Sequence, residues 1–415
     1  MLFFKYYSPV PIAFSLIRNG EMFFAQADEL NDSNELRPTF ILKGDKELWG
    51  RLFDYILIHS AFLLDKGYTR SKTRSQLVYA VSGNLSAQFY KRYWRQDIRL
   101  EELYSLVKDD VLASDFGDMS PKVIAANFEQ FMRREVSELV RPREFIASFS
   151  NSGINTMMWG HYAKAGKGFA IVYESSDSTL KITSDLKIYD GSRDKNGILL
   201  PGQKADGIIT IGTWADATLE LKKVHYAPRD VKVNAFHLFT PHFFYSEEED
   251  HYDVPLLIGA GAPKKGEDRV GLIKDEVWGF EDEIRAFLPL YSDKNEYIPP
   301  SKRVAMVDLS HFRGLILGPE ISEKDRIELI VALKSLLFSR RARGDSRAEE
   351  HNLVVFQAVR GRDSFSYKVH PSYVINGTRK LTELSALHES ESRRQSPEAW
   401  MLADQVNQKR RRLGR

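Results

Sequence analysis

A block of helix-type sequence, residues 46–140, interrupts a chain whose other segments favour strands. Apolar residues in this block recur at helical spacing, as in Leu48-Trp49, Leu52-Phe53 and Ile56-Leu57. Runs of strands that are separated by a block of helices are typical of α+β proteins rather than of a parallel doubly wound sheet. We therefore predict an α+β fold, with a mixed or antiparallel sheet core and an inserted helical subdomain.

The segments outside the block concentrate β-branched and aromatic residues, which favour strands. The predicted strands cover residues 3–7, 22–24, 144–150, 168–173, 277–290, 314–318, 353–359 and 365–369, the last two pairing as a hairpin. An amphipathic helix is predicted over residues 322–339 because Ser322 can cap its amino terminus. The resulting division is 1–45 for the first core elements, 46–140 for the insertion, 141–377 for the rest of the core, and 378–415 for a basic, weakly ordered tail.

Composition excludes several kinds of chemistry. The 415 residues include no cysteine, so disulfides, thiolate metal sites and cysteine nucleophiles are excluded. The histidines His225, His237, His242 and His251 lack metal-ligand spacing, and we expect no metal site. The start of the chain lacks the pattern of a signal peptide, and no segment reaches the ~20 apolar residues of a membrane span. We expect a cytoplasmic protein that does not contact membranes.

The sharpest feature of the sequence is the segment 274–285, Lys-Asp-Glu-Val-Trp-Gly-Phe-Glu-Asp-Glu-Ile-Arg, which combines charged and aromatic residues. Alternate residues of a strand share a face. If the segment is a strand, one face carries Glu281, Glu283 and Arg285, and the other carries Trp278, Phe280 and Ile284. If it is a helix instead, Glu281 and Arg285 form an ordinary i,i+4 ion pair, which contributes only a few tenths of a kcal/mol.

Several motifs occur together in a fixed order along residues 1–320. They are Lys5-Tyr6-Tyr7, Asn31-Asp32 with Glu35, Ser148-Phe149-Ser150, the block Met158-Trp159-Gly160-His161-Tyr162-Ala163, Gly168, the set Lys274, Trp278, Glu281, Glu283 and Arg285, and Leu317-Gly318. In this order they resemble the bacterial family called domain of unknown function 2971. The chain departs from the family's pattern at Ser33, where the family has proline, and in the long helical insertion.

A second resemblance, to ADP-ribosyltransferases, implies an activity. These enzymes use an aromatic or basic residue on an early strand, a serine on a middle strand and a late glutamate, often within Glu-x-Glu. The matching residues here are Tyr6 or Tyr7, then Ser148 or Ser150, then Glu281 with Glu283. The resemblance implies an NAD-consuming transferase or glycohydrolase, acting on NAD and an unknown acceptor in the manner of a toxin or a phage-defence effector.

Each of these residues has a physical reason for its role. Cleaving the nicotinamide–ribose bond builds positive charge on the sugar, which Glu283 would stabilise. Glu281 would orient or deprotonate the acceptor. Tyr6 or Tyr7 would stack on nicotinamide, and Ser148 or Ser150 would bond the ribose. Arg285 completes the set of predicted NAD-binding residues.

Two alternative functions and one further site candidate remain at this point. The charged segment could shape a pocket or an ion-pair network in a non-catalytic binding module that recognises a protein or a nucleic acid. The basic tail, with Arg393-Arg394 and residues 409–412, would then contact phosphates. A sugar hydrolase that uses Glu281 and Glu283 as its carboxylate pair is disfavoured, because such pairs usually come from different strands. His161 is a further site candidate, although Trp159 and Tyr162 beside it suit packing better.

Overall fold

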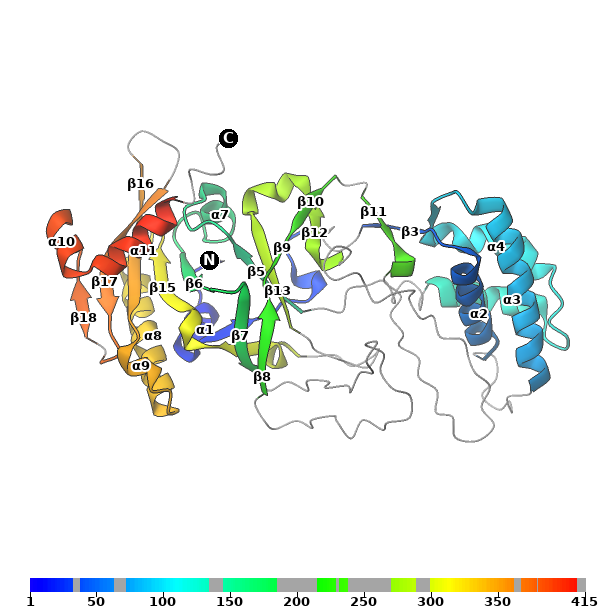
Figure 1. The fold of residues 1–415 in the computed structure, drawn as a ribbon, viewed down its shortest axis with the longest axis horizontal. Helices are drawn as coiled ribbons and strands as arrows, with labels where there is room; N and C mark the ends of the chain where they lie inside the picture. Colours follow the sequence, from blue (N-terminus) through cyan, green and yellow to red (C-terminus); the bar gives the residue numbers. More distant parts are fainter. Residues whose placement is uncertain are drawn as a thin grey trace.

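The computed structural model describes most of the chain. The described residues are 1–32, 38–62, 72–133, 145–184, 215–228, 231–237, 270–288, 299–361, 367–378 and 380–408. The structure combines mixed and antiparallel sheets with packed helices and a further block of helices, so the α+β prediction is confirmed (Figure 1). Some sequence features lie outside the described residues, namely Glu35, His242, His251 and residues 409–412.

The core is a mixed sheet that has nine strands among the described residues, in the order β18-β17-β16-β15-β6-β1-β5-β13-β9. In chain order these are β1 (Leu2–Tyr7), β5 (Phe145–Ser150), β6 (Phe169–Glu174), β9 (Lys222–Lys223), β13 (Glu283–Leu288), β15 (Phe312–Leu317), β16 (Leu353–Arg360), β17 (Tyr367–Ile375) and β18 (Leu381–Glu383). Strands β15 and β16 run parallel, and the other neighbours run antiparallel. The predicted hairpin is present as β16 and β17.

Helices cover both faces of this sheet. On one face, α1 (Pro11–Asn19) and α8 (Glu323–Ala342) pack against Phe3, Phe149 and other apolar residues. On the opposite face, α7 (Thr156–His161) and α11 (Pro397–Gln408) pack against Phe4, Tyr6 and their neighbours. Because side chains alternate along a strand, adjacent residues of β1 belong to different cores.

A second sheet has the order β2-β14-β7-β8 and shares the core formed with α1 and α8. Its strands are β2 (Glu21–Phe23), β7 (Thr179–Ser184), β8 (Ala215–Glu220) and β14 (Val304–Val307). Helix α1 ends just before β2 at Gly20, whose φ of 67° is a left-handed conformation that favours glycine. This C-cap lets the chain reverse and enter the second sheet.

The helical block has its own hydrophobic core, at the end of the molecule opposite α10 (Glu389–Gln395) (Figure 1). It contains α2 (Lys46–Phe62), α3 (Lys72–Tyr93), α4 (Leu103–Leu112) and α5 (Pro121–Phe131). A small sheet, β11 (Lys232–Asn234), β3 (Thr39–Leu42) and β4 (Ile98–Arg99), joins it to the rest of the chain. None of the described helices is both long enough and apolar enough to cross a membrane.

The structure corrects the prediction of a weakly ordered tail from residue 378, at least as far as Gln408. Strand β18 extends the main sheet, and α10 and α11 follow it. Ala399, Ala403 and Val406 of α11 are buried against the sheet, and burial of this apolar helix face orders the segment. Arg393, expected to contact phosphates, bonds Asp404 and lies over the Trp400 ring.

Candidate functional site

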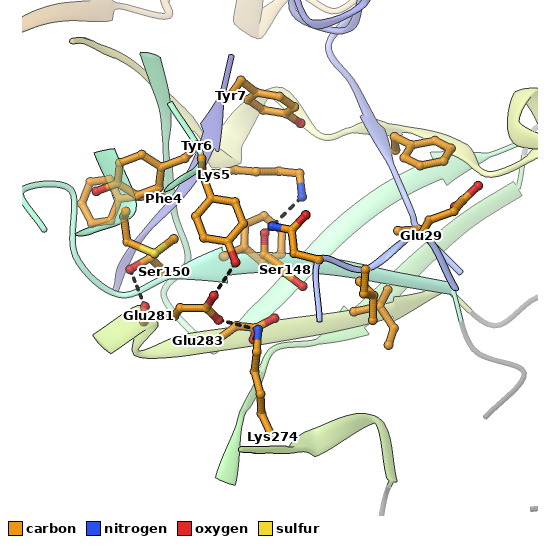
Figure 2. A pocket seen from close by; sticks show the side chains of 18 residues that line it. Phe4, Lys5, Tyr6, Tyr7, Glu29, Ser148, Ser150, Lys274, Glu281 and Glu283 are labelled. Carbon is orange, nitrogen blue, oxygen red and sulfur yellow. Dashed lines mark hydrogen bonds and ion pairs between the residues drawn. The ribbon is translucent and has the colours of Figure 1, made fainter. Parts of the chain in front are cut away.

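A cavity of about 250 Å³ lies where β1, β5 and β13 meet (Figure 2). Its wall includes most of the residues that the sequence analysis selected, namely Tyr6, Tyr7, Ser148, Ser150, Glu281 and Glu283. The other lining residues are Phe4, Lys5, Phe23, Ala25, Glu29, Leu30, Asn31, Ile146, Phe149, Met158, Tyr162 and Lys274. Segments that are far apart in sequence therefore meet at one place.

Strand pairing explains why these segments meet. Phe4 of β1 lies opposite Ser150 of β5, and Ser150 lies opposite Glu283 of β13. Residues that lie opposite each other in an antiparallel pair point to the same face. Farther along β5, Ile146 pairs with Ala25 instead of with β1. The cavity opens between these two pairings.

The structure also corrects the prediction of one continuous strand over residues 277–290. Residues Glu276–Glu281 form a 3₁₀ helix, η6, and the strand β13 begins only at Glu283. The Asp275 carboxylate accepts a hydrogen bond from the Val277 N–H at 3.0 Å and so starts the helix. Asp282 ends it with a left-handed φ of 42°. Glu281 therefore reaches the cavity from the end of a helix, whereas Glu283 reaches it from a strand.

A buried network of ion pairs forms one side of the cavity. Lys274 Nζ lies 2.6 Å from Glu281 Oε2 and 3.2 Å from Glu283 Oε2. Arg285 holds Glu283 with two hydrogen bonds, from Nε to Oε1 at 2.7 Å and from Nη2 to Oε2 at 2.9 Å. The Tyr162 hydroxyl donates to Glu281 Oε1. Glu281 and Glu283 are only 2% and 3% exposed. The network therefore lies in surroundings of low dielectric constant, where its hydrogen bonds and ion pairs are stronger than in water.

Burial controls the protonation of the network. Desolvation raises the pKa of Glu283 to about 7, against the opposing effect of Lys274 and with a further increase from Glu281. Desolvation also raises the pKa of Tyr162, with a further increase from the Glu281 charge. A carboxyl group that titrates near neutral pH is suited to proton transfer.

The two adjacent tyrosines of β1 have different surroundings. The Tyr6 hydroxyl donates to the Ser152 carbonyl at 2.6 Å, and its ring packs edge-on against Trp159 at 5.1 Å between centroids. Tyr6 is therefore held by the protein itself. The Tyr7 ring stacks on Phe169, and its buried hydroxyl has no hydrogen-bond partner among the described residues.

The two serines of β5 also differ. The Ser150 hydroxyl donates to the Glu281 carbonyl at 2.7 Å and accepts from the Ser152 N–H at 3.2 Å, so it anchors the end of η6. Ser148 hydrogen-bonds the Glu283 carboxylate and is less buried than Ser150. The Ser148 hydroxyl is therefore better placed than the Ser150 hydroxyl to contact a ligand.

Arg285 lies behind the cavity rather than in its wall. It is 0% exposed, and its Nη1 donates to the Gly271 carbonyl at 2.6 Å. The guanidinium therefore positions the Glu283 carboxylate. His161 lies against Trp278 and Phe280 and does not line the cavity. Within the described ranges, no cluster of three or more histidine and carboxylate groups could hold a metal ion.

Sequence reasoning did not select three residues of the wall that carry chemistry, Lys5, Lys274 and Tyr162. Lys274 belongs to a motif that was noted without a role for the lysine, and Tyr162 was expected to serve packing, whereas its hydroxyl bonds Glu281. Lys5 directly precedes the selected tyrosines, and its Nζ donates to the Ser148 carbonyl at 3.1 Å. The sequence signal that could have identified these three residues is their position close to selected residues within the same motifs.

The comparisons with known proteins agree with part of this description. A family model described as protein of unknown function (DUF2971) matches residues 158–286. The match supports the resemblance to that family over a segment that includes Tyr162, Lys274, Glu281 and Glu283. No curated protein and no solved structure matches the chain.

Proposed function

We propose that this protein cleaves the nicotinamide–ribose bond of NAD and either transfers the ADP-ribosyl group to an acceptor or releases it to water. The observation that carries the proposal is the convergence of Tyr7, Ser148 and the carboxylates of Glu281 and Glu283 on one cavity. These residues come from three distant parts of the chain, namely β1, β5 and the segment where η6 meets β13. Their meeting places an aromatic ring, a hydroxyl and an acidic pair around the same volume.

The carboxylates of Glu281 and Glu283 differ in how many hydrogen bonds they can still accept from a ligand. A carboxylate has about four acceptor positions. Glu283 accepts from Lys274, twice from Arg285 and from Ser148, so its positions are largely filled. Glu281 side-chain oxygens accept from Tyr162 and Lys274, which leaves room for a ligand hydroxyl. We assign Glu281 to a ribose or acceptor hydroxyl, and Glu283 to stabilising the positive charge that develops on the sugar.

The size of the cavity limits how much of the substrate it encloses. Sites that enclose drug-sized ligands occupy roughly 300–1,000 Å³. At about 250 Å³, the cavity suits the nicotinamide and its ribose better than a whole dinucleotide. The adenosine half would then extend along the surface outside the cavity.

Release of nicotinamide from NAD tests the proposal directly. We expect the wild type to release nicotinamide, measured by chromatography with and without candidate protein acceptors. Glu281→Gln should lower the rate by about 10²–10³-fold, because an amide cannot orient or deprotonate a ribose or acceptor hydroxyl as a carboxylate does. Glu276→Gln is the matched control, because Glu276 is an exposed residue of the same 3₁₀ helix.

Glu283→Gln needs a separate control for folding. The substitution leaves Arg285 and Lys274 buried with less compensating charge, which can cost about 3–5 kcal/mol. Its circular dichroism and melting temperature must therefore be compared with those of the wild type. Wild-type protein that releases no nicotinamide with acceptors supplied would refute the enzyme proposal. A folded Glu283→Gln variant with the wild-type rate would remove the role of Glu283.

Binding without turnover is the second candidate function. The observation that favours it is the near-complete engagement of Glu283 by Arg285, Lys274 and Ser148, which is what a structural ion-pair network also requires. On this view the cavity binds NAD or ADP-ribose as a signal. Saturable binding of NAD in calorimetry, with no release of nicotinamide over hours, would favour this function over catalysis.

A further inference from the structure

Lys5 is a cation in the cavity wall that forms no ion pair with any described carboxylate. Its side chain extends from β1 into the gap beside β5 (Figure 2). The ammonium group donates one hydrogen bond, to the main-chain carbonyl of Ser148 at 3.1 Å. It lies 5.3 Å from the ring centre of Phe149 and 5.8 Å from that of Tyr7. An ammonium group has three donors, so two are available to a ligand.

The other cations near the cavity have carboxylate partners. Lys274 pairs with Glu281 and Glu283, and Arg285 pairs with Glu283. At the opposite side, Arg303 pairs with Glu29. Among the described residues, these four cations therefore accompany three carboxylates, and Lys5 carries the excess positive charge of this set.

Tyr7 supplies a second donor on the same side of β1. Residues 5 and 7 of a strand point to the same face, and Figure 2 shows both side chains extending in the same direction. The buried Tyr7 hydroxyl lacks a hydrogen-bond partner among the described residues. Leaving a buried hydroxyl unpaired costs free energy that a ligand oxygen would recover.

We infer that Lys5 and Tyr7 form a subsite for one oxyanion, a phosphate or a carboxylate group of the ligand. The ammonium group supplies a charge-assisted hydrogen bond, and the phenol supplies a neutral one. The anion also balances the excess charge of the cavity. This subsite does not depend on cleavage of NAD, because it concerns only the charge and donors of the wall.

Binding of the anion is coupled to uptake of protons by Lys5. Burial lowers the pKa of Lys5 to about 8, and the charge of Glu283 opposes this decrease. The groups that face the amine are the Tyr7 ring on β1, the Ser148 carbonyl and the Phe149 ring on β5, and the more distant Glu283 on β13. A bound anion favours the charged amine. At pH 8, binding should therefore take up about half a proton per anion.

Isothermal titration calorimetry with inorganic pyrophosphate, phosphate and acetate tests the subsite. We expect saturable binding to the wild type, with proton uptake at pH 8 measured from two buffers of different ionisation enthalpy. Lys5→Met should weaken binding about tenfold or more, Lys5→Arg less, and Tyr7→Phe about fivefold. The control is Lys324→Met, which removes an exposed lysine of α8 and should change nothing. Comparing pyrophosphate and phosphate with acetate distinguishes the two kinds of oxyanion.

Two results would overturn the inference. One is the absence of saturable binding of every probe to the wild type, and the other is equal affinity of the wild type and Lys5→Met. Covalent trapping of an aldehyde on Lys5 by cyanoborohydride, without anion binding, would instead make the amine a nucleophile. Lys5→Met removes a buried charge and should fold. Nicotinamide release is a separate measurement, so wild-type protein that releases nicotinamide but binds no anion would refute the subsite and leave the proposed function standing.

Discussion

Removing one hydroxyl from each of two adjacent tyrosines should change stability in opposite directions. The Tyr6 hydroxyl donates to the Ser152 carbonyl at 2.6 Å, and both groups are buried. Tyr6→Phe therefore loses this hydrogen bond and leaves a buried carbonyl unpaired, at a cost of about 1–3 kcal/mol. The Tyr7 hydroxyl has no partner among the described residues, so Tyr7→Phe removes an unpaired buried group. It should be neutral or stabilise the protein by about 1 kcal/mol.

The difference between the two variants should be large enough to measure. A gap of about 1–4 kcal/mol corresponds to roughly 2–16 °C in melting temperature for a folding unit of 150–250 residues. Differential scanning calorimetry and the midpoint of urea unfolding would both detect it. Tyr173→Phe is a useful comparison, because the Tyr173 hydroxyl is also buried without a partner among the described residues, interacts electrostatically with Tyr7 and does not line the cavity.

The stability of Tyr7→Phe tests whether the Tyr7 hydroxyl is unpaired in the free protein. Destabilisation equal to that of Tyr6→Phe would mean that the Tyr7 hydroxyl is already satisfied in the free protein. The donor assigned to the ligand would then be lost, and so would the basis for Tyr7 in the oxyanion subsite. A stable Tyr7→Phe variant with weakened anion binding would separate the contribution of the hydroxyl to binding from its contribution to folding.

Three further predictions concern Lys5, a pair of glycines and Ser150. The unfolded chain binds the Lys5 proton more tightly than the folded protein, so the stability of the wild type relative to Lys5→Met should rise by about 3 kcal/mol from pH 8 to 10.5, as measured by urea unfolding. The comparison must be with Lys5→Met because the buried tyrosines, whose pKa burial raises, lower the stability of both proteins near pH 10. Gly168→Ala would place a Cβ atom 2.1 Å from the Tyr7 carbonyl oxygen, and urea unfolding should show a loss of about 1–3 kcal/mol in the free energy of unfolding. Gly83→Ala is the control, because a Cβ atom there meets open space and should stabilise α3 by about 0.5–1 kcal/mol. Ser150→Ala should cost about 1–2 kcal/mol in the same assay because it leaves the buried Glu281 carbonyl unpaired, and an unchanged midpoint would contradict its anchoring role.

Elements with a strong local pattern were predictable from the sequence. The aromatic and β-branched residues of β1, β5 and β6 specify strands through their own side chains, and Gly20 ends α1 through its own backbone freedom. The segment before Glu283 was not predictable in this way. Its alternation of large and charged residues fits a strand, but the Asp275 cap and the left-handed Asp282 make it a 3₁₀ helix.

Six residues of the candidate site were selected from the sequence, but the choice between Tyr6 and Tyr7 and between Ser148 and Ser150 was left open. Tyrosine, serine and glutamate have side chains that suit a binding site, but this chemistry is the same for both members of a neighbouring pair. The distinction between Tyr6 and Tyr7 depends on Ser152, which is 146 residues away from Tyr6 in the chain. The distinction between Ser148 and Ser150 depends in the same way on the distant Glu281 and Glu283.

Residue types and local conformation are determined by near neighbours, so the sequence alone specified the α+β class, most core strands and the acidic pair. Burial, counter-ions and unpaired donors arise when strands from distant parts of the chain meet, as at the contact between Lys5 and Ser148, 143 residues apart. Only the tertiary structure could decide that Lys5 lacks a carboxylate among the described residues while Lys274 has two. The free energy of a charge depends on what surrounds it in space, and sequence order does not contain that information.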